Sequence, residues 1–507
     1  MAPTFWHYLY GSISTSDIQH PNRLIIMFSI SFTFIILILS AALTLRKNKK
    51  KQRLRLPPGS FGWPILGETL EFLNKGKAGE PDAFVKERMH RYGGTQVFKT
   101  SLTGNKVAVL CGPAGNKFLF GNENKVVQLW WPLSAKKLLG NGLSNRVGEE
   151  ARRVRKMVGY FVSPDALMRL YINTVDQVTR QHLNSHWAGK QVVKTFPVIK
   201  SYTFELACRL FMSLEDPHHI AKLASLFNVF LKGVISIPLY IPGTRFYRAS
   251  RATSTVRKEL SLLLQHRRSA LLSKTASPSQ DLLSHLLASP DDHGNFMSES
   301  EIINNVLLLL FAGHDTSSVT ITLLLKTLGE LPHVYEHVRQ EQLEIASSKA
   351  QGEFLGWEDI QKMKYSWNVV CEVMRLWPPI MGAFREALVD LNYAGYDIPK
   401  GWKLYWTPAS TQKEPDLFPD PTRFDPCRFE GAGPKAYSYV PFGGGPRMCL
   451  GKEYARVEIL VFLHNLVKDF RWSLIVPDEK IIYDPMPTPV QGLPVRLQPH
   501  ECCDKTA

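Results

Sequence analysis

The chain has 507 residues, 44% of them hydrophobic, and a formal net charge of +16 at neutral pH. This length exceeds the usual size of one core, but no Gly/Ser-rich or Pro-rich linker and no repeat of 20–50 residues divides the sequence, so one large globular body is expected. Seven cysteines without metal-clip spacing argue against a disulfide framework and against zinc fingers. The sequence therefore does not favour nucleic-acid binding, and its basic charge suits an anionic membrane surface or an acidic protein partner.

The N-terminal part contains a candidate membrane anchor. Residues 24–45 are 22 consecutive uncharged, mostly apolar residues. At ~1.5 Å rise per residue they reach ~33 Å, enough to cross the hydrocarbon core of a bilayer. Residues 46–55 carry seven basic and no acidic side chains, which predicts that they stay in the cytosol. We expect a short lumenal N-terminus (1–23) and a single-pass transmembrane anchor (24–45) rather than a cleaved signal peptide.

Residues 46–64 combine this basic run with a proline-rich segment. Pro57, Pro58 and Pro64 restrict the backbone and exclude a helix. The segment is predicted to be a stiff, extended elbow, with an ordinary turn-rich linker as the alternative. The remaining residues, 65–507, are expected to form the main domain.

The main domain is predicted to be mainly α with small peripheral β-sheets. Apolar residues recur at three- and four-residue spacing over residues 164–192 and 224–274, which indicates helices. Strand-like segments are short, and the sequence places them at residues 96–102, 106–110, 393–398 and 403–406.

A long helix is predicted to begin near Ser298. Ser298 and Glu301 fit a capping box, and the following thirty or so residues are apolar nearly all round, as in a buried central helix. Residues 313–318 (GHDTSS) place polar groups in its middle, where they are costly unless they have partners. Gly313 and the hydroxyls are expected to loosen the helix there, which indicates a site; a satisfied Ser/Thr cluster at a helix contact is the alternative.

Two further segments complete the set of motifs. A helix over residues 357–376 contains Glu372 and Arg375 at i and i+3, where they can pair. The stretch from Phe442 to Gly451 reads F-G-G-G-P-R-M-C-L-G, which sets Cys449 in a glycine-rich loop two residues after Arg447. A structural cysteine does not need such glycines, whereas a cysteine that approaches something large and flat does.

These motifs resemble, in type and order, those of the cytochrome P-450 monooxygenases. The loop matches F-x-x-G-x-R-x-C-x-G, residues 312–316 (AGHDT) match the central-helix motif, Glu372 and Arg375 match E-x-x-R, and residues 421–429 match the segment that follows. The resemblance implies a cytochrome P-450 fold with an N-terminal transmembrane helix, and haem b bound through a thiolate. A thiolate ligand favours O–O cleavage more than an imidazole does.

The resemblance also implies roles for individual residues. Cys449 is the expected axial ligand of the haem iron, and Thr316 and Asp315 are the expected residues of oxygen activation. Glu372, Arg375 and Arg428 are expected to form a structural salt-bridge cluster. The sequence departs from the family pattern at Ala151, where a tryptophan is often found, and Leu450 is a less usual residue after the cysteine. The other expected haem contacts are Arg447, Arg385, Arg155, Phe442 and Ala312.

A finer resemblance is to plant triterpenoid oxidases of the β-amyrin 28-oxidase kind. It rests on residues 362–375, 382–387, 401–406, 444–460 and 484–495. It implies that the substrate is a membrane-borne triterpene such as β-amyrin, which is oxidised at C-28 with dioxygen. It implies that NADPH–cytochrome P-450 reductase delivers the electrons from NADPH. It also implies a location at the endoplasmic reticulum, with the catalytic domain facing the cytosol. Lys452 and Arg456 are candidate docking residues for the reductase. The expected substrate pocket contains Leu309, Leu310, Ala312, Ile380, Met381 and Val490, with residues 128–137 at its mouth.

Other functions remain open at this point. The same chemistry at another ring position, or on a tetracyclic triterpenoid or sterol, fits the same motifs. A haem-thiolate isomerase or dehydratase needs no Asp-Thr pair for oxygen activation, and a non-enzymatic haem or sterol carrier needs no electrons. Dependence of turnover on NADPH and a reductase separates the monooxygenase from both of these.

Overall fold

The computed structural model describes residues 33, 37, 54–64 and 66–500. Apart from residues 33 and 37, the predicted anchor lies outside the described residues, as do most of the basic run, Cys502 and Cys503. The chain divides into two compact units, Met1–Arg55 and Leu56–Ala507, and the second is described here. Within the described residues, one helix (Glu299–Glu330) is long and apolar enough to cross a membrane, and 67% of its most apolar window is buried inside the protein.

Helices make up most of this unit, as predicted. In chain order the α-helices are α3 (Thr69–Ala78), α4 (Ala83–Arg91), α5 (Gly112–Gly121), α6 (Leu133–Leu139), α7 (Gly148–Phe161), α8 (Pro164–Ala166), α9 (Ile172–His186), α10 (Thr195–Met212), α11 (Pro217–Val234), α12 (Arg245–Leu272), α13 (Leu282–Ala288), α14 (Glu299–Glu330), α15 (Pro332–Ser347), α16 (Trp357–Lys362), α17 (Lys364–Leu376) and α18 (Lys452–Asp469).

The two regions predicted to be helical each contain more than one helix. Residues 164–192 form α8, a π-helical turn (Leu167–Tyr171) and α9, which ends at His186. Residues 224–274 fall in α11 and α12, which are separated by residues 235–244. Pro238 and Pro242 lie in this connection and cannot continue a helix, so the helical region is divided there.

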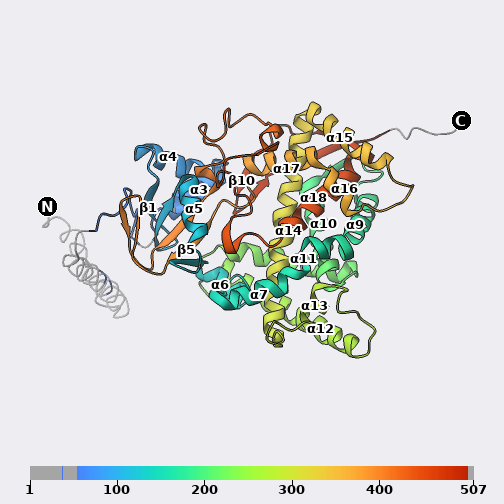
Figure 1. Cartoon of the computed structure of the whole chain (residues 1–507), viewed down its shortest axis with the longest axis horizontal. Helices are drawn as coiled ribbons and strands as arrows, with labels where there is room; N and C mark the ends of the chain where they lie inside the picture. Colours follow the sequence, from blue (N-terminus) through green and yellow to red (C-terminus); the bar gives the residue numbers. More distant parts are fainter. Residues whose placement is uncertain (1–32, 34–36, 38–53, 65, 501–507) are drawn as a thin grey trace, which may run out of the picture. The chain divides into compact units, whose positions relative to one another are not determined.

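The sheets are small and lie beside the helices (Figure 1). The largest has the order β1-β2-β8-β5-β3, with β2 and β8 parallel and the other pairs antiparallel. Residues 393–398, predicted as one strand, instead form the hairpin of β6 and β7, because Ala394 and Gly395 both adopt positive φ. The strands are β1 (Val97–Leu102), β2 (Asn105–Leu110), β3 (Val127–Trp130), β4 (Val192–Lys194), β5 (Ala383–Ala387), β6 (Leu391–Tyr393), β7 (Tyr396–Ile398), β8 (Lys403–Trp406), β9 (Phe470–Leu474), β10 (Ile481–Tyr483), β11 (Pro487–Pro489) and β12 (Pro494–Pro499).

Helix α14 lies at the centre of the helical part, where it packs against α10, α17 and α18 (Figure 1). Its start is the predicted capping box: the Glu301 N–H donates to Ser298 Oγ, and the Ser298 N–H donates to Glu301 Oε2 at 3.0 Å. The predicted loosening at Gly313 is not present, because the helix is continuous over its 32 residues. Its apolar side chains belong to the main core.

The described part of the proline-rich segment is anchored to β1, and it contains a bend at Pro58 and a turn at Pro64. The Lys99 N–H donates to Pro58 O at 2.7 Å, and Lys99 Nζ donates to Pro57 O at 2.7 Å. Gly59 has a φ of +130°, and a Cβ there would lie 2.1 Å from Lys99 O. Only glycine allows this approach without displacing the backbone.

Candidate active site

The loop before α18 holds Cys449 in a defined conformation. The Cys449 N–H donates to Phe442 O at 2.9 Å, and the Gly443 N–H donates to Val440 O at 2.9 Å. A 3-10 turn over Gly445–Arg447 follows, and α18 begins at Lys452. The thiol is therefore fixed by backbone hydrogen bonds just before a long buried helix.

The glycines of this loop are required by close packing against α5. Gly445 has a φ of +65°, and a Cβ there would lie 2.3 Å from Phe120 O. A Cβ on Gly444 would lie 2.5 Å from Cδ2 of the Phe120 ring. The glycines thus allow the loop to lie against Phe120, a contact that the sequence motif does not reveal.

Cys449 differs from the buried structural cysteines. Its side chain is exposed, and desolvation by the surrounding chain raises the pKa of its thiol. A backbone hydrogen bond from Gly451 and the charge of Arg155 act in the opposite direction and lower that pKa. Cys371, by contrast, is buried, and burial raises its pKa to about 12. Cys449 is thus an accessible thiol with a cation and an N–H group nearby, which suits a metal-bound thiolate.

The middle of α14 presents a second surface of the site. Leu309, Ala312, Gly313 and Thr316 share one helix face, and none of them is fully buried; Ala312 is exposed. The Thr316 hydroxyl donates to Ala312 O at 2.7 Å, which satisfies it without interrupting the helix. Exposed residues in the middle of a core helix indicate an internal space beside it.

Asp315 is buried and has a cationic partner. Lys200 Nζ, on α10, lies 2.8 Å from Asp315 Oδ1, whereas His314 Nε2 lies 3.9 Å from the same oxygen. Burial lowers the pKa of His314, which keeps its ring neutral, so Lys200 supplies the charge that balances Asp315. The sequence analysis did not anticipate Lys200, because a lone lysine in α10 carries no signal that links it to α14.

The three predicted haem-contacting arginines come together near the thiol loop. Arg155 Nη2, on α7, donates to Met448 O at 2.6 Å. Arg385, on β5, donates from Nε to Glu123 Oε2, and Arg447 Nε lies 3.7 Å from Glu123 Oε1. Arg447 also donates from Nη1 to Leu143 O at 3.3 Å. Glu123 was not recognised in the sequence.

These arginines fit a ligand with two negative charges. Within the described residues, Glu123 is the one carboxylate that forms ion pairs with Arg385 or Arg447, and Arg155 has none. Arg447 Nε is buried without a hydrogen-bond partner. Three guanidinium groups against one carboxylate leave two positive charges, which is costly in a partly buried cluster. The two propionates of a haem supply the missing charge, so the residues present fit haem.

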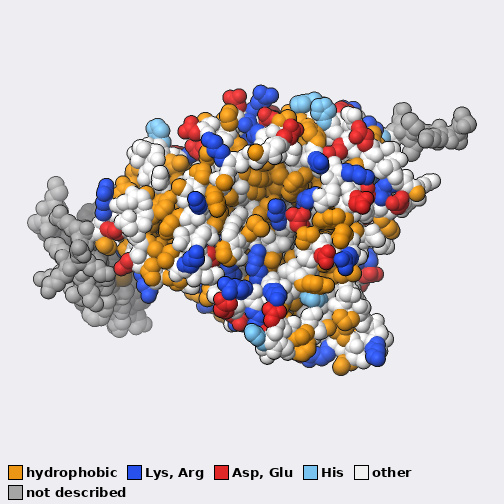
Figure 2. Space-filling model, in the orientation of Figure 1, with side chains coloured by type: hydrophobic (Ala, Val, Ile, Leu, Met, Phe, Trp, Pro, Cys, Tyr) orange, Lys and Arg blue, Asp and Glu red, His pale blue; other side chains and the backbone are white. Residues whose placement is uncertain are grey.

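The other predicted pocket residues have unequal positions. Ile380 and Val490 are 41% and 59% exposed, and Phe442 and Met381 are half-buried. Met381 O accepts hydrogen bonds from the Tyr405 hydroxyl and the Thr407 hydroxyl, both at 2.7 Å, which fixes its backbone. Leu310 is fully buried in the main core, on the helix face opposite to Ala312. Figure 2 shows hydrophobic side chains gathered on the face between the strand-rich and the helix-rich parts.

The mouth segment predicted over residues 128–137 spans two elements. It contains most of β3 and the first part of α6, joined at Pro132. Because β3 pairs with β5, this segment lies next to the strand that carries Arg385.

The predicted structural salt bridge forms. Arg375 donates from Nε and Nη2 to the two oxygens of Glu372, at 2.6 and 2.8 Å, and both side chains are fully buried. Arg428 Nε lies 3.4 Å from Glu372 Oε1. Arg375 Nη1 also donates to Gln412 O and Pro421 O, so the pair joins α17 to the segment that precedes the thiol loop.

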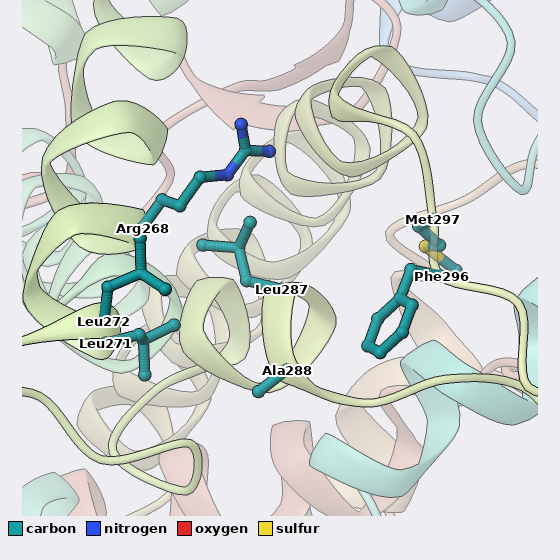
Figure 3. A pocket seen from close by; sticks show the side chains of 7 residues that line it. All are labelled: Arg268, Leu271, Leu272, Leu287, Ala288, Phe296 and Met297. Atoms are coloured by element: carbon teal, nitrogen blue, oxygen red, sulfur yellow. The ribbon is translucent and has the colours of Figure 1, made fainter. Parts of the chain in front are cut away.

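A separate pocket lies on the surface, away from these residues. It lies among α12, α13 and the segment before α14 (Figure 3). None of its lining residues belongs to the motifs above. They are Arg268, Leu271, Leu272, Leu287, Ala288, Phe296 and Met297.

Comparisons with known proteins agree with this geometry. The cytochrome P-450 family model matches residues 57–496. A beta-amyrin 28-monooxygenase of Saponaria officinalis is 55% identical over 88% of this chain and 92% of its own length, and one of Vitis vinifera is 54% identical with the same coverage. A retinoic acid bound cyanobacterial cytochrome P-450 superposes with a TM-score of 0.79 at 36% identity, over 88% of this chain and 100% of that chain. The chain therefore belongs to the cytochrome P-450 family and is a monooxygenase of that family.

Proposed function

We propose that the protein oxidises a pentacyclic triterpene, β-amyrin at C-28, with dioxygen and with electrons that a reductase delivers from NADPH. The observation that carries this proposal is the identity of 53–55% with six plant proteins named beta-amyrin 28-monooxygenase, over 88% of the chain. Further oxidation of the same carbon fits the same site.

The residues around the thiol loop are proposed to hold haem b. Cys449 would hold the iron, and Arg155, Arg385 and Arg447 would hold the propionates, as their charges and positions allow. Bound in this way, haem supplies the activation of dioxygen that lets an unreactive C–H bond be hydroxylated.

Residues of α14 and α10 are proposed to move protons to the reacting centre. Asp315 is buried but contacts Lys200, whose side chain is 24% exposed, so the pair connects solvent to the middle of α14. The Thr316 hydroxyl, next in the chain, lies on the less buried helix face and is oriented by its bond to Ala312 O. Lys200 and Asp315 thus give protons a route inward, and Thr316 holds a proton where oxygen is reduced.

The apolar wall of the site suits a rigid terpenoid. Leu309, Ile380 and Val490 are apolar and incompletely buried, so an apolar substrate covers them and excludes water. Ile380 and Met381 follow Pro379, and Met381 is fixed through its carbonyl, so the wall has a set shape. Such a wall determines which carbon lies near the oxidant.

A membrane location, at the endoplasmic reticulum with the main domain in the cytosol, is also proposed. It is supported by the sequence of residues 24–45 and by an exposed apolar segment between α11 and α12. Five residues of this segment are 47–68% exposed, which is unusual for a surface that faces water. They are Ile235, Ile237, Leu239, Tyr240 and Ile241.

The electron donor is proposed to dock on the side of the molecule that carries the thiol loop. Of the two docking residues suggested by the sequence, Arg456 already donates to Glu453 Oε2 at 3.1 Å and to Ile360 O, so it is not a free surface cation. Lys452 is half-buried at the start of α18. A reductase interface centred on Arg456 is therefore not supported.

The proposal is tested by co-expression with a β-amyrin-forming cyclase and a reductase, followed by mass spectrometry of the products. We expect C-28-oxidised β-amyrin that requires NADPH and disappears in Cys449→Ala. Cys371→Ala, which removes a buried thiol, is the matched control and should retain product. Oxidation at another carbon, oxidation only of a different triterpene, or turnover without NADPH would each contradict the proposed reaction.

A further inference from the structure

Glu123 occupies an unusual position for a carboxylate. It lies between α5 and β3, and its side chain is 1% exposed. Its Oε1 accepts the Leu129 N–H at 3.0 Å, so the carboxylate is anchored to the backbone of β3. Buried carboxylates are rare unless they are paired, and here the partners are two arginines that approach the same group.

The two arginines come from distant parts of the chain. Arg385 lies on β5 directly opposite Leu129 of β3, and its Nε donates to Glu123 Oε2. Its Nη1 donates to Phe384 O at 3.0 Å. Arg447 lies in the thiol loop, with its Nε 3.7 Å from Glu123 Oε1. Glu123 thus connects the sheet to the loop that carries Cys449.

Two guanidinium groups so close together repel each other. Burial is the main cause that lowers the pKa of Arg447; the charge of Glu123 raises it, and the charges of Arg385 and Arg155 lower it further. The bond from Arg385 Nε to Glu123 Oε2 orients Arg385, and the same carboxylate balances one of the two positive charges. Arg447 donates from Nη1 to Leu143 O and from Nη2 to Arg146 O, so Glu123 acts on Arg447 through its charge. Both guanidinium groups keep N–H groups that can face a second anion.

We propose that Glu123 is a positioning residue that orients Arg385 toward the haem propionates and, beside Arg447, sets the net charge of this cluster. Glu123 does not itself contact the propionates. With Glu123, the three guanidinium groups carry two excess positive charges, which equals the charge of two propionates. This inference rests on the proposed assignment of these arginines to haem, and it goes beyond that assignment by naming the group that orients Arg385 and sets the charge of the cluster.

Two consequences follow for variants of Glu123. In Glu123→Gln the shape and the acceptor for Leu129 remain, but one negative charge near the haem is lost, so the reduced haem is favoured and the reduction potential becomes more positive. The arginines also lose their charged partner, and we expect haem to dissociate roughly tenfold faster, since a hydrogen bond to a charged group is stronger than one to a neutral group. Glu123→Asp keeps the charge but shortens the reach, so haem loss should accelerate while the potential stays near that of the wild type.

The experiment uses the full chain loaded with haem. The reduction potential is measured by spectroelectrochemistry, and haem loss is measured by transfer to an apoglobin acceptor. Glu149→Gln is the control, because Glu149 is an exposed carboxylate paired with Arg152 at 2.8 Å on α7. We expect Glu123→Gln to change both quantities, Glu123→Asp to change haem loss alone, and Glu149→Gln to change neither.

The results that overturn the proposal are equally specific. Wild-type potential and wild-type haem loss in Glu123→Gln would refute it, and so would an equal change in Glu149→Gln. If Glu123→Gln does not fold, Glu123→Asp decides: haem loss at the wild-type rate refutes the positioning role. No substrate enters these measurements, so a failure of the proposed triterpene oxidation leaves their outcome unaffected.

Discussion

The glycines of the thiol loop allow a sharp test, because each is required for a different reason. Gly443 has a φ of +68° and has Trp406, at 3.8 Å, as the only neighbour of an added Cβ. An alanine there meets only the conformational cost of the left-handed region, about 1–2 kcal/mol. Gly444 has an extended φ of −164°, so its alanine meets only the Phe120 ring, 2.5 Å from the new Cβ. Overpacking of this kind costs about 1–3 kcal/mol.

Gly445 combines both costs. Its φ is +65°, and the obstacle to a Cβ is Phe120 O at 2.3 Å. The sum of the two costs is about 2–5 kcal/mol for Gly445→Ala, the largest loss in the series. A backbone oxygen cannot rotate away as a side chain can, so the loop or α5 must move.

The assay is urea unfolding, monitored through the thiolate-type carbonyl spectrum of the reduced protein. We expect Gly445→Ala to lose more stability than either Gly443→Ala or Gly444→Ala. A second substitution separates the causes: Phe120→Leu removes the ring and should partly restore Gly444→Ala, but it keeps the carbonyl and should not restore Gly445→Ala. Equal losses at all three glycines, or equal rescue at both sites, would refute the reasoning.

Three further predictions concern α14, the buried ion pair and pH. Thr316→Ala should keep haem but divert electrons to peroxide, so the ratio of product formed to NADPH consumed should fall. Thr322→Ala, which removes a buried hydroxyl bonded to Ser318 O, is the control and should keep the wild-type ratio. Glu372→Ala should cost about 3–5 kcal/mol in urea unfolding, because Arg375 is left buried without a carboxylate. Glu353→Ala removes an exposed carboxylate from Lys349, which keeps Asp359 as a partner, and should change stability far less. Burial lowers the pKa of His464 to about 4, so the unfolded chain binds the proton more tightly. The neutral ring of His464 therefore adds at most about 3 kcal/mol to the free energy of unfolding; this contribution is complete above about pH 6.5 and is lost as the pH falls toward 4. His464→Gln should flatten the dependence of the free energy of unfolding on pH over this range, and an unchanged dependence would contradict the reasoning.

Local signals in the sequence were sufficient for much of the fold. The capping box at Ser298, the strand Lys403–Trp406 and the pairing of Glu372 with Arg375 were predicted with their observed positions, because each depends on residues within a few positions of one another. The family of the chain was also recognisable from the spacing within the thiol loop. The prediction of one strand over residues 393–398 was wrong, because positive φ at Ala394 and Gly395 divides this segment into a hairpin.

The tertiary structure alone decided which distant groups meet. Phe120 explains Gly444 and Gly445, Lys200 balances Asp315, and Glu123 brings Arg385 and Arg447 together. Each of these contacts joins segments far apart in the chain, so no periodicity or spacing encodes it. The sequence by itself determined the chemistry of this protein, since the thiol and its loop are local; how that chemistry is held and charged depends on long-range packing, which only the fold provides.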